Sequence, residues 1–247
     1  MQTFKGQTAV VTGAGRGIGK VIAAQLLAEG ATVHVPDLDE GRSRDSAAEL
    51  GAGAKPARLD VRNASDIASY FKTLEAQGGV DLLVNCAGGY APLVPTLKIT
   101  EAEYDMVMDS NLKGTFLCCQ AVIPGMIRKK AGAIVNFSSL AGRQTSPALG
   151  SPYTAAKAGV LGLTRHLAKE FGAQGVRVNA IAPGTTEGER VAGLLTPEDR
   201  SRQLAGIPLG RFTTAEDIAD VVLFLLSPKA RYVTGATIDV NGGVLTI

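Results

Sequence analysis

Short runs of aliphatic and β-branched residues alternate along this chain with longer segments of helical periodicity. The alternation is typical of a parallel sheet whose strands are joined by crossover helices. We expect seven strands, at Thr8–Thr12, Thr32–Asp37, Lys55–Val61, Leu82–Ala87, Ala133–Ser138, Val176–Ala182 and Thr237–Val240. We expect six helices, at Gly17–Glu29, Glu40–Leu50, Ala64–Gln77, Glu101–Lys130, Tyr153–Phe171 and Ala215–Leu226. The pattern predicts an α/β fold built on a doubly wound parallel sheet.

Nothing in the sequence divides the chain into smaller units. It has 247 residues, of which 45% are hydrophobic, so it can bury a substantial core. No repeat, low-complexity tract or flexible linker interrupts it, and we expect a single domain over residues 1–247. Residues 185–211 are charged, rich in glycine and weakly periodic. Because they follow a strand, at the edge where such sheets bind ligands, we expect them to form a substrate lid.

Charge and hydropathy exclude two classes of partner. The 25 basic and 23 acidic residues give a net charge of +2 and are spread along the chain, which indicates no surface for nucleic acid or anionic membrane. The longest apolar stretch, Ile218–Leu226, contains Asp220 and is too short to span a bilayer. The N-terminus has no signal-peptide pattern, so we expect a cytoplasmic protein.

The sequence indicates no metal site. Of the three cysteines, Cys118 and Cys119 are adjacent and cannot easily pair with each other or chelate one ion, so we interpret all three, with Cys86, as small core residues. His34 falls in a strand and His166 in a helix, and neither is expected to be catalytic or to bind a metal.

A glycine-rich turn, Thr12-Gly-Ala-Gly-Arg-Gly-Ile-Gly19, joins the first expected strand to the first expected helix. Glycines let backbone amides approach a pyrophosphate, and the N-terminus of the helix supplies N–H groups and a partial positive charge. The same glycines could serve only a tight turn. Their place between a strand and a helix favours dinucleotide binding instead. The expected contacts are Gly13, Arg16, Gly17, Ile18 and Gly19.

An acidic residue, Asp37, closes the second strand about 20 residues beyond the glycine loop, where a carboxylate can bind the adenosine ribose hydroxyls and repel a 2′-phosphate. This favours NAD over NADP as the cofactor. Arg16 and Arg42 argue the other way, because a guanidinium can pair with that phosphate. Asp37 could also simply begin a turn.

Tyr153 and Lys157 stand four residues apart at the start of an expected helix, which places both on one face. Ser151 is a suitable N-cap and Pro152 a suitable first helical residue. A neighbouring ammonium and the positive helix end both favour a phenolate, so they lower the pKa of a tyrosine and let it exchange a proton with an alcohol. The spacing alone is weak support, since chance matches are common.

Two polar residues give the pair its context. Ser139 ends a strand on the same sheet edge as the glycine loop, where its hydroxyl could donate to a substrate carbonyl, although a serine there is more often a turn or cap residue. Asn111 is an unfavourable helix former inside an apolar helical stretch. It could bend the helix and hold a water, or be purely structural.

Taken in order, these motifs resemble those of the short-chain dehydrogenase/reductase family over essentially the whole chain. They are the glycine loop, Asn85-Cys86-Ala87-Gly88, Asn111, Ser139, Tyr153-x-x-x-Lys157 and Pro183-Gly184. The resemblance implies a Rossmann fold whose seven-stranded parallel sheet has the order 3-2-1-4-5-6-7. It also implies a homotetramer.

The resemblance further implies roles for single residues. Tyr153 is the acid–base, Lys157 binds the nicotinamide ribose and lowers the tyrosine pKa, Ser139 orients the carbonyl, and Asn111 holds a relay water. Residues expected against the cofactor are Asp60 and Val61 near the adenine, Asn85, Ala87 and Gly88 in the cleft, and Ile181, Pro183 and Gly184 near the nicotinamide.

The chain departs from the family pattern at two loops. Ser139 and Tyr153 are separated by one residue more than is common, which suggests an insertion in the loop Leu140–Pro152 beside the substrate. The threonine that usually follows the Pro-Gly motif is replaced by Glu187 or Gly188. We expect Thr186, or else Thr185, to make the corresponding cofactor contact.

The predicted function is interconversion of a secondary alcohol and a ketone by an NAD(P)-dependent oxidoreductase. The pattern is closest to 3-oxoacyl-[acyl-carrier-protein] reductases, and Asp37 gives catabolic alcohol oxidation equal weight. Sugar, polyol or steroid dehydrogenases and a non-catalytic dinucleotide sensor are the alternatives. Arg128-Lys-Lys130 could meet an acidic carrier protein or be a solvated helix end. Residues expected around the alcohol or ketone are Ser139, Tyr153, Tyr90, Gln144 and Leu149, with Val191 and Leu194.

Overall fold

A seven-stranded sheet runs through the centre of the computed structural model, which describes residues 2–89, 94–145, 149–188, 193 and 195–246. The strands are β1 Thr8–Val11, β2 Thr32–Asp37, β3 Ala54–Arg58, β4 Leu82–Asn85, β5 Gly132–Phe137, β6 Val176–Pro183 and β7 Thr237–Val240. All paired strands are parallel, and their order is β3-β2-β1-β4-β5-β6-β7. Both the fold class and the strand order are as predicted.

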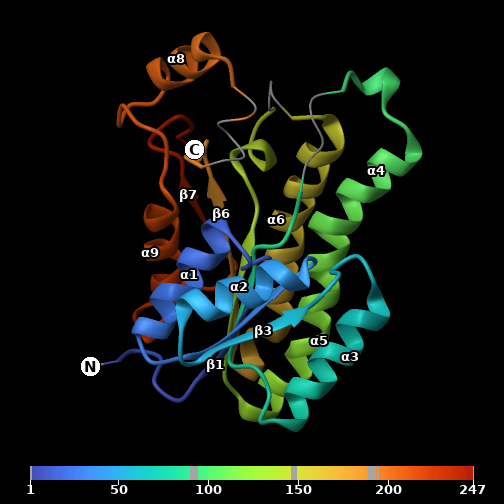
Figure 1. The fold of residues 1–247 in the computed structure, drawn as a ribbon, viewed down its shortest axis with the longest axis vertical. Helices are drawn as coiled ribbons and strands as arrows, with labels where there is room; N and C mark the ends of the chain where they lie inside the picture. Colours follow the sequence, from blue (N-terminus) through green and yellow to red (C-terminus); the bar gives the residue numbers. More distant parts are fainter. Residues whose placement is uncertain (1, 90–93, 146–148, 189–192, 194, 247) are drawn as a thin grey trace.

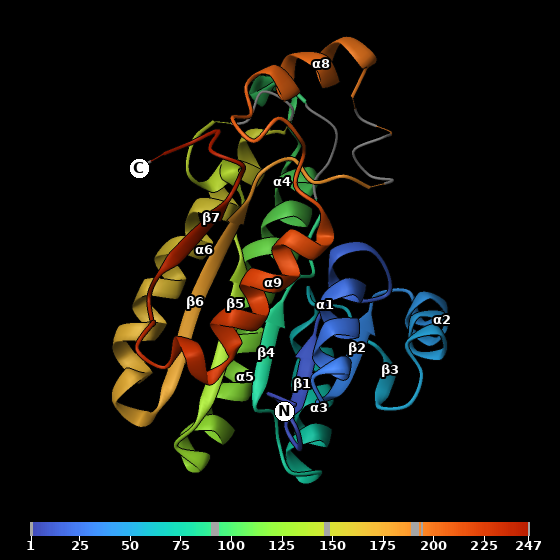
Figure 2. The same cartoon turned by 90° about the vertical axis from the view of Figure 1, so that its left-hand side faces the viewer.

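Helices cover both faces of this sheet (Figures 1 and 2). On one face lie α1 Gly17–Ala28, α2 Glu40–Leu50 and α9 Ala215–Leu226, and on the other lie α3 Ala64–Ala76, α4 Glu101–Met108, α5 Gly114–Lys129 and α6 Ser151–Phe171. Since the helices run back from the carboxyl edge, every loop that follows a strand opens at that edge.

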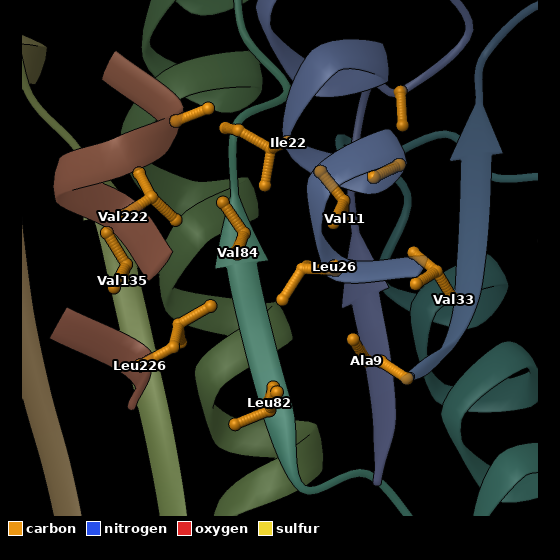
Figure 3. Close-up of a cluster of buried hydrophobic side chains, with 14 of the residues drawn as sticks. Ala9, Val11, Ile22, Leu26, Val33, Leu82, Val84, Val135, Val222 and Leu226 are labelled. Carbon is orange, nitrogen blue, oxygen red and sulfur yellow. The ribbon is translucent and has the colours of Figure 1, made fainter. Parts of the chain in front are cut away.

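The core has two halves, one on each side of the sheet. In the half shown in Figure 3, Ile22 and Leu26 of α1 meet Val222 and Leu226 of α9 over the aliphatic side chains of β1, β2, β4 and β5. Central strands buried on both faces form near-continuous apolar runs, which is why their sequence pattern was easy to recognise. This packing holds the carboxyl edge rigid.

Two predicted helix boundaries were wrong. The segment Glu101–Lys130 is not one helix, because a π-helical turn at Asp109–Lys113 separates α4 from α5. The cap of α6 is Gly150, and Ser151 is already helical, with its hydroxyl accepting a hydrogen bond from Thr96 Oγ1 (3.2 Å). Both differences concern local backbone geometry, which an apolar pattern does not record.

Among the described residues of the segment 185–211 lies a helix that was not predicted, α8 Pro197–Ala205. It lies beyond the carboxyl ends of the strands (Figure 2). Thr196 caps it and Pro197 begins it, and none of its residues is buried. No helix in the described part of the chain is both long enough and apolar enough to cross a membrane.

Candidate active site

The glycine loop begins where β1 ends and leads directly into α1. The amide of Gly13 donates to the Pro36 carbonyl of β2 (2.8 Å), and α1 starts at Gly17. The first amides of a helix have no partner within it, so this N-terminus offers donors and a partial positive charge to an anion. A Cβ on Gly19 would lie 2.7 Å from the Gly13 carbonyl, so the loop folds tightly only with glycine there.

Asp37, at the end of β2, is turned toward this loop. Its Oδ2 accepts from the Gly15 amide (3.1 Å), and its Oδ1 accepts from the Asp39 amide (3.1 Å). Arg42 is paired with Asp39, with 3.5 Å between Nε and Oδ2, and Arg16 is exposed at the start of α1. The carboxylate of Asp37 is therefore the charged group directly against the loop.

Asp60 and Val61 lie between β3 and α3, two and three residues beyond Arg58, where β3 ends. Arg62 donates hydrogen bonds to the Asp60 carboxylate from Nε (2.9 Å) and Nη2 (2.7 Å), and these bonds lower the pKa of Asp60. Val61 packs against Gly114, where a Cβ would approach the Val61 carbonyl to 2.7 Å. The predicted adenine contacts therefore lie on a loop fixed to the start of α5.

The segment after β4 meets both β1 and α6. The Ala87 amide donates to Thr12 Oγ1 (3.0 Å), and Gly88 lies between Asn111 and Lys157: a Cβ there would be 2.4 Å from Asn111 Oδ1 and 3.6 Å from Lys157 Nζ. The side chain of Asn85 points elsewhere. It is buried and donates to Asn136 Oδ1 (2.9 Å) and to Cys119 Sγ (3.3 Å), so only its main chain can face a cofactor.

Asn111 lies in the π-helical turn and is completely buried. Its Nδ2 donates to the carbonyls of Gly89 (2.6 Å) and Val107 (2.8 Å), while its Oδ1 has no hydrogen-bond partner among the described residues. An unsatisfied buried carbonyl is costly, so this oxygen is a natural acceptor for a donor that the protein itself does not supply.

Tyr153 and Lys157 face the same space from the first turns of α6. Lys157 is 5% exposed, and its Nζ lies 5.5 Å from the centroid of the Tyr153 ring. The same Nζ donates to the Phe137 carbonyl at the end of β5 (2.8 Å). Sequence reasoning missed this carbonyl, because a backbone acceptor has no sequence signal.

Ser139 lies two residues beyond Phe137, the last residue of β5. It is the N-cap of the 3₁₀ turn Leu140–Gly142, and its Oγ accepts from the Ala141 amide (3.1 Å). The neighbouring Ser138 donates to the Lys157 carbonyl (2.8 Å), which ties the end of β5 to α6. The structure therefore brings the four predicted catalytic positions to one corner of the carboxyl edge.

The loop after β6 is held on two sides. The Gly184 amide donates to the Val240 carbonyl of β7 (2.9 Å), and Thr186 Oγ1 donates back to the Gly184 carbonyl (3.2 Å). Thr185 instead bonds Gln203 of α8 (2.9 Å), and Glu187 forms an ion pair with Arg200 of the same helix. The connection from β6 to α8 therefore begins with Pro183, Gly184 and Thr186.

Only part of the expected substrate surface can be placed. Tyr90, Val191 and Leu194 lie outside the described residues, Leu149 is half-buried, and Gln144 is exposed. The structure adds a small cavity of about 20 Å³ beside Tyr153, lined mainly by Val94, Ile99, Val107, Gly150 and Pro152 with Glu103. Gly150 and Pro152 belong to the start of α6. The other lining residues come from α4 and the segment before it, a side of the site that the sequence analysis did not consider.

Arg128 and Lys129 are remote from this corner. Arg128 pairs with Glu75, and Lys129 Nζ lies 2.7 Å from Asp81, immediately before β4 and so at the amino edge of the sheet. A carrier protein delivering a substrate to Ser139 would have to meet the opposite edge. The alternative interpretation, a solvated helix end, is the one that this geometry favours.

The described cysteine and histidine side chains are not part of the four-residue corner. Burial raises the pKa of Cys119 to about 12 and raises the pKa of Cys118 still further, and burial also lowers the pKa of His34. His166 forms an exposed contact with Glu170. Within the described ranges, no group of three His, Cys, Asp or Glu side chains could hold a metal ion.

The comparisons with known proteins agree with this geometry. Residues 13–245 match the family model described as "Enoyl-(Acyl carrier protein) reductase". The chain is 42% identical to 2-(S)-hydroxypropyl-CoM dehydrogenase 3 of Xanthobacter autotrophicus, covering 99% of this chain and 98% of the relative. It is 40% identical to a 3-oxoacyl-[acyl-carrier-protein] reductase of Staphylococcus aureus, covering 96% and 98%.

A solved structure matches closely as well. The 3-oxoacyl-[acyl-carrier protein] reductase of Brucella melitensis with bound NAD superimposes with a TM-score of 0.92 at 34% identity, covering 100% of this chain and 94% of that one. Fold, glycine loop and relatives lead to one conclusion. The chain belongs to the short-chain dehydrogenase/reductase family and is an NAD(P)-dependent oxidoreductase acting on CH–OH donors.

Proposed function

We propose that this enzyme interconverts a secondary alcohol and a ketone, with Tyr153 as the acid–base. The observation that carries the proposal is the position of Lys157, whose buried ammonium lies 5.5 Å from the Tyr153 ring and is oriented by the Phe137 carbonyl. A fixed cation at this distance stabilises a phenolate, so Tyr153 can take a proton from an alcohol or return one to a ketone near neutral pH.

The residues present fit a nicotinamide dinucleotide. The glycine loop and the N-terminus of α1 would hold its pyrophosphate, Asp37 its adenosine ribose, and Lys157 its second ribose. When bound, the cofactor supplies hydride transfer. Ser139 donates a hydrogen bond to the substrate oxygen, and Asn111 presents its Oδ1 to a donor that connects Lys157 with solvent. Asp37 favours NAD over NADP.

Substitution of the proposed acid–base tests this assignment. Tyr153→Phe removes only the hydroxyl, so turnover measured by absorbance at 340 nm should fall at least ~10³-fold while dinucleotide affinity stays within ~3-fold. Retained turnover would refute the role of Tyr153. Dinucleotide binding by the wild-type chain without turnover of any alcohol or ketone would favour a sensor instead.

We infer two candidate substrate classes, 3-oxoacyl thioesters and secondary alcohols. One relative is named as a 2-(S)-hydroxypropyl-CoM dehydrogenase and another as a 3-oxoacyl-[acyl-carrier-protein] reductase. Asp37 and the position of Arg128 and Lys129 at the wrong edge favour oxidation of a small free alcohol. A panel of 3-oxoacyl thioesters and secondary alcohols, each assayed with NAD(H) and NADP(H), separates them.

We also propose that the enzyme is a homotetramer and that residues 185–211 act as its lid. A groove that runs from the end of α4 across the π-helical turn to α5 and α6 supports the first point. It is lined by Met108, Leu112, Lys113, Phe116 and Leu163, and Phe116 is 41% exposed there, so a second copy would cover it. Phe116→Glu should reduce the molar mass measured by light scattering. A tetramer unaffected by this change would place the interface elsewhere.

A further inference from the structure

Arg143 joins the turn that carries Ser139 to the last strand of the sheet. Its Nε and Nη2 donate to the two carboxylate oxygens of Asp239 in β7, each at 3.1 Å, and Nη2 also donates to the Thr237 carbonyl (3.3 Å). The side chains of Arg143 and Asp239 are only 18% and 21% exposed. A bidentate, largely shielded pair of this kind fixes direction as well as distance.

The other side of the same turn is pressed against α6. A Cβ on Gly142 would lie 2.6 Å from Ser138 Oγ and 2.7 Å from the Lys157 carbonyl, so the turn Leu140–Gly142 has no room to move toward the helix. Contact with α6 alone would still allow it to move away. The Arg143–Asp239 pair closes that direction, and the turn is held between α6 and β7.

We propose that Arg143 and Asp239 are positioning residues, which hold the Ser139 hydroxyl at a fixed place relative to Tyr153. This proposal rests on the proposed function. Ser139 and Tyr153 are joined by a long loop, and Ser139 is the cap of the turn that Arg143 immediately follows. Displacement of a catalytic group by about 1 Å can cost ~10²-fold in rate, so loss of the pair should act on the chemical step.

β7, which binds Arg143 through Asp239, also supports the loop after β6 on the other side of the site. The carbonyl of Val240, next to Asp239, accepts from the Gly184 amide (2.9 Å) and from Thr213 Oγ1 (3.3 Å). These bonds use the backbone of β7 and do not involve the Asp239 side chain. Removing that carboxylate therefore releases the Ser139 turn and leaves the loop after β6 in place.

The experiment compares Arg143→Met, Asp239→Asn and the double variant with wild type. We expect each single variant to lower kcat by about 10-fold or more, with dinucleotide Kd within about 2-fold, and the double variant to be no slower than the worse single one. The primary isotope effect on kcat with a C4-deuterated cofactor should be at least as large as in wild type, since the chemical step is what slows.

Arg177→Met is the matched control, because it removes another partly buried arginine, one that lies near the amino end of β6. It should lower thermal stability with kcat unchanged. If kcat of Arg143→Met or Asp239→Asn stays within about 2-fold of wild type below the unfolding transition, the proposal is overturned. Multiplicative losses in the double variant would also overturn it.

Asp239→Asn keeps the shape of the side chain, so it tests the positioning role even if Arg143→Met fails to fold. Tyr153→Phe separates this proposal from the function on which it rests. If kcat is unchanged in Asp239→Asn and Tyr153→Phe is inactive, only the positioning role is rejected. If Tyr153→Phe remains active, the proposed function is rejected.

Discussion

Gly13 and Ala87 touch backbone to backbone across the top of the sheet. A Cβ on Gly13 would lie 2.9 Å from the Cα of Ala87, and Gly13 itself has a φ of +70°. The glycine loop and the end of β4 can therefore adopt this arrangement only without a side chain at position 13.

Gly13→Ala should weaken dinucleotide binding at least ~10-fold and destabilise the fold by about 1–3 kcal/mol. The strain of a positive φ and the close contact with Ala87 both contribute to this loss of stability. Titration calorimetry and urea unfolding measure the two effects. Gly162→Ala is the control: it lies inside α6 with nothing within 4 Å of the added Cβ, so it should be neutral or slightly stabilising. Equal behaviour of the two variants would contradict this account of the loop.

Arg177 acts as a cap for α9. Its Nη1 donates to the carbonyls of Leu225 (2.6 Å) and Ala230 (3.1 Å), and its Nη2 donates to those of Leu226 (2.8 Å) and Ser227 (3.3 Å). Arg177→Met should cost about 2–3 kcal/mol in unfolding free energy, since carbonyls at a helix end lose a charged donor. A loss below about 0.5 kcal/mol in urea unfolding would show that water replaces the guanidinium at little cost.

Asp37 should select the cofactor. Asp37→Ser removes a carboxylate next to the Gly15 amide, so NADP should no longer meet a like charge at its 2′-phosphate. We expect the ratio of kcat/KM for NADP over NAD to rise about 10-fold or more. Asp45→Asn, which removes an exposed carboxylate from α2, controls for net charge and should leave the ratio unchanged. An unchanged ratio in Asp37→Ser would move cofactor selection elsewhere.

The contribution of Asp217 to stability at the start of α9 should depend on pH. Hydrogen bonds from Arg211 and Thr214 lower the pKa of Asp217 well below its ordinary value of 3.8. A lowered pKa in the folded state gives stability that is present above pH 3.8 and is lost as the pH falls through the folded pKa. Asp217→Asn should therefore cost about 1 kcal/mol at pH 7, and progressively less as urea unfolding is repeated at pH 3 and below. A constant difference would be inconsistent with an ionised cap.

Sequence analysis identified elements with buried apolar side chains, such as β4 and α9, and also β3 and β7, which have no buried residue. β2, α2, β7 and α9 have the predicted bounds. α8 was missed because its sequence is mostly polar and shows no apolar helical period, although Thr196, Pro197 and Asp199 carried a helix-start signal. The π-helical turn was missed because its short sequence, Asp-Ser-Asn-Leu-Lys, carries no signal that separates it from a turn of α-helix.

In the site, Tyr153, Lys157 and the glycine loop were recognisable from short-range spacing and from their place on a strand or helix. Arg143 was not, because its partner Asp239 is 96 positions away and only the tertiary fold brings the two together. The direction of the Asn85 side chain could not be predicted either. Because β4 is buried on both faces, its sequence does not show which side chains point to which face.

The π-helical turn at Asp109–Lys113 places Asn111 by adding one residue to an otherwise regular helix. Deleting Leu112 or Lys113 would let α4 and α5 join as a continuous α-helix, and everything before the deletion, Asn111 included, would rotate by about 100° relative to α5. The buried amide would then leave the cleft even if its own codon were untouched. Length, as much as residue identity, is constrained in this segment.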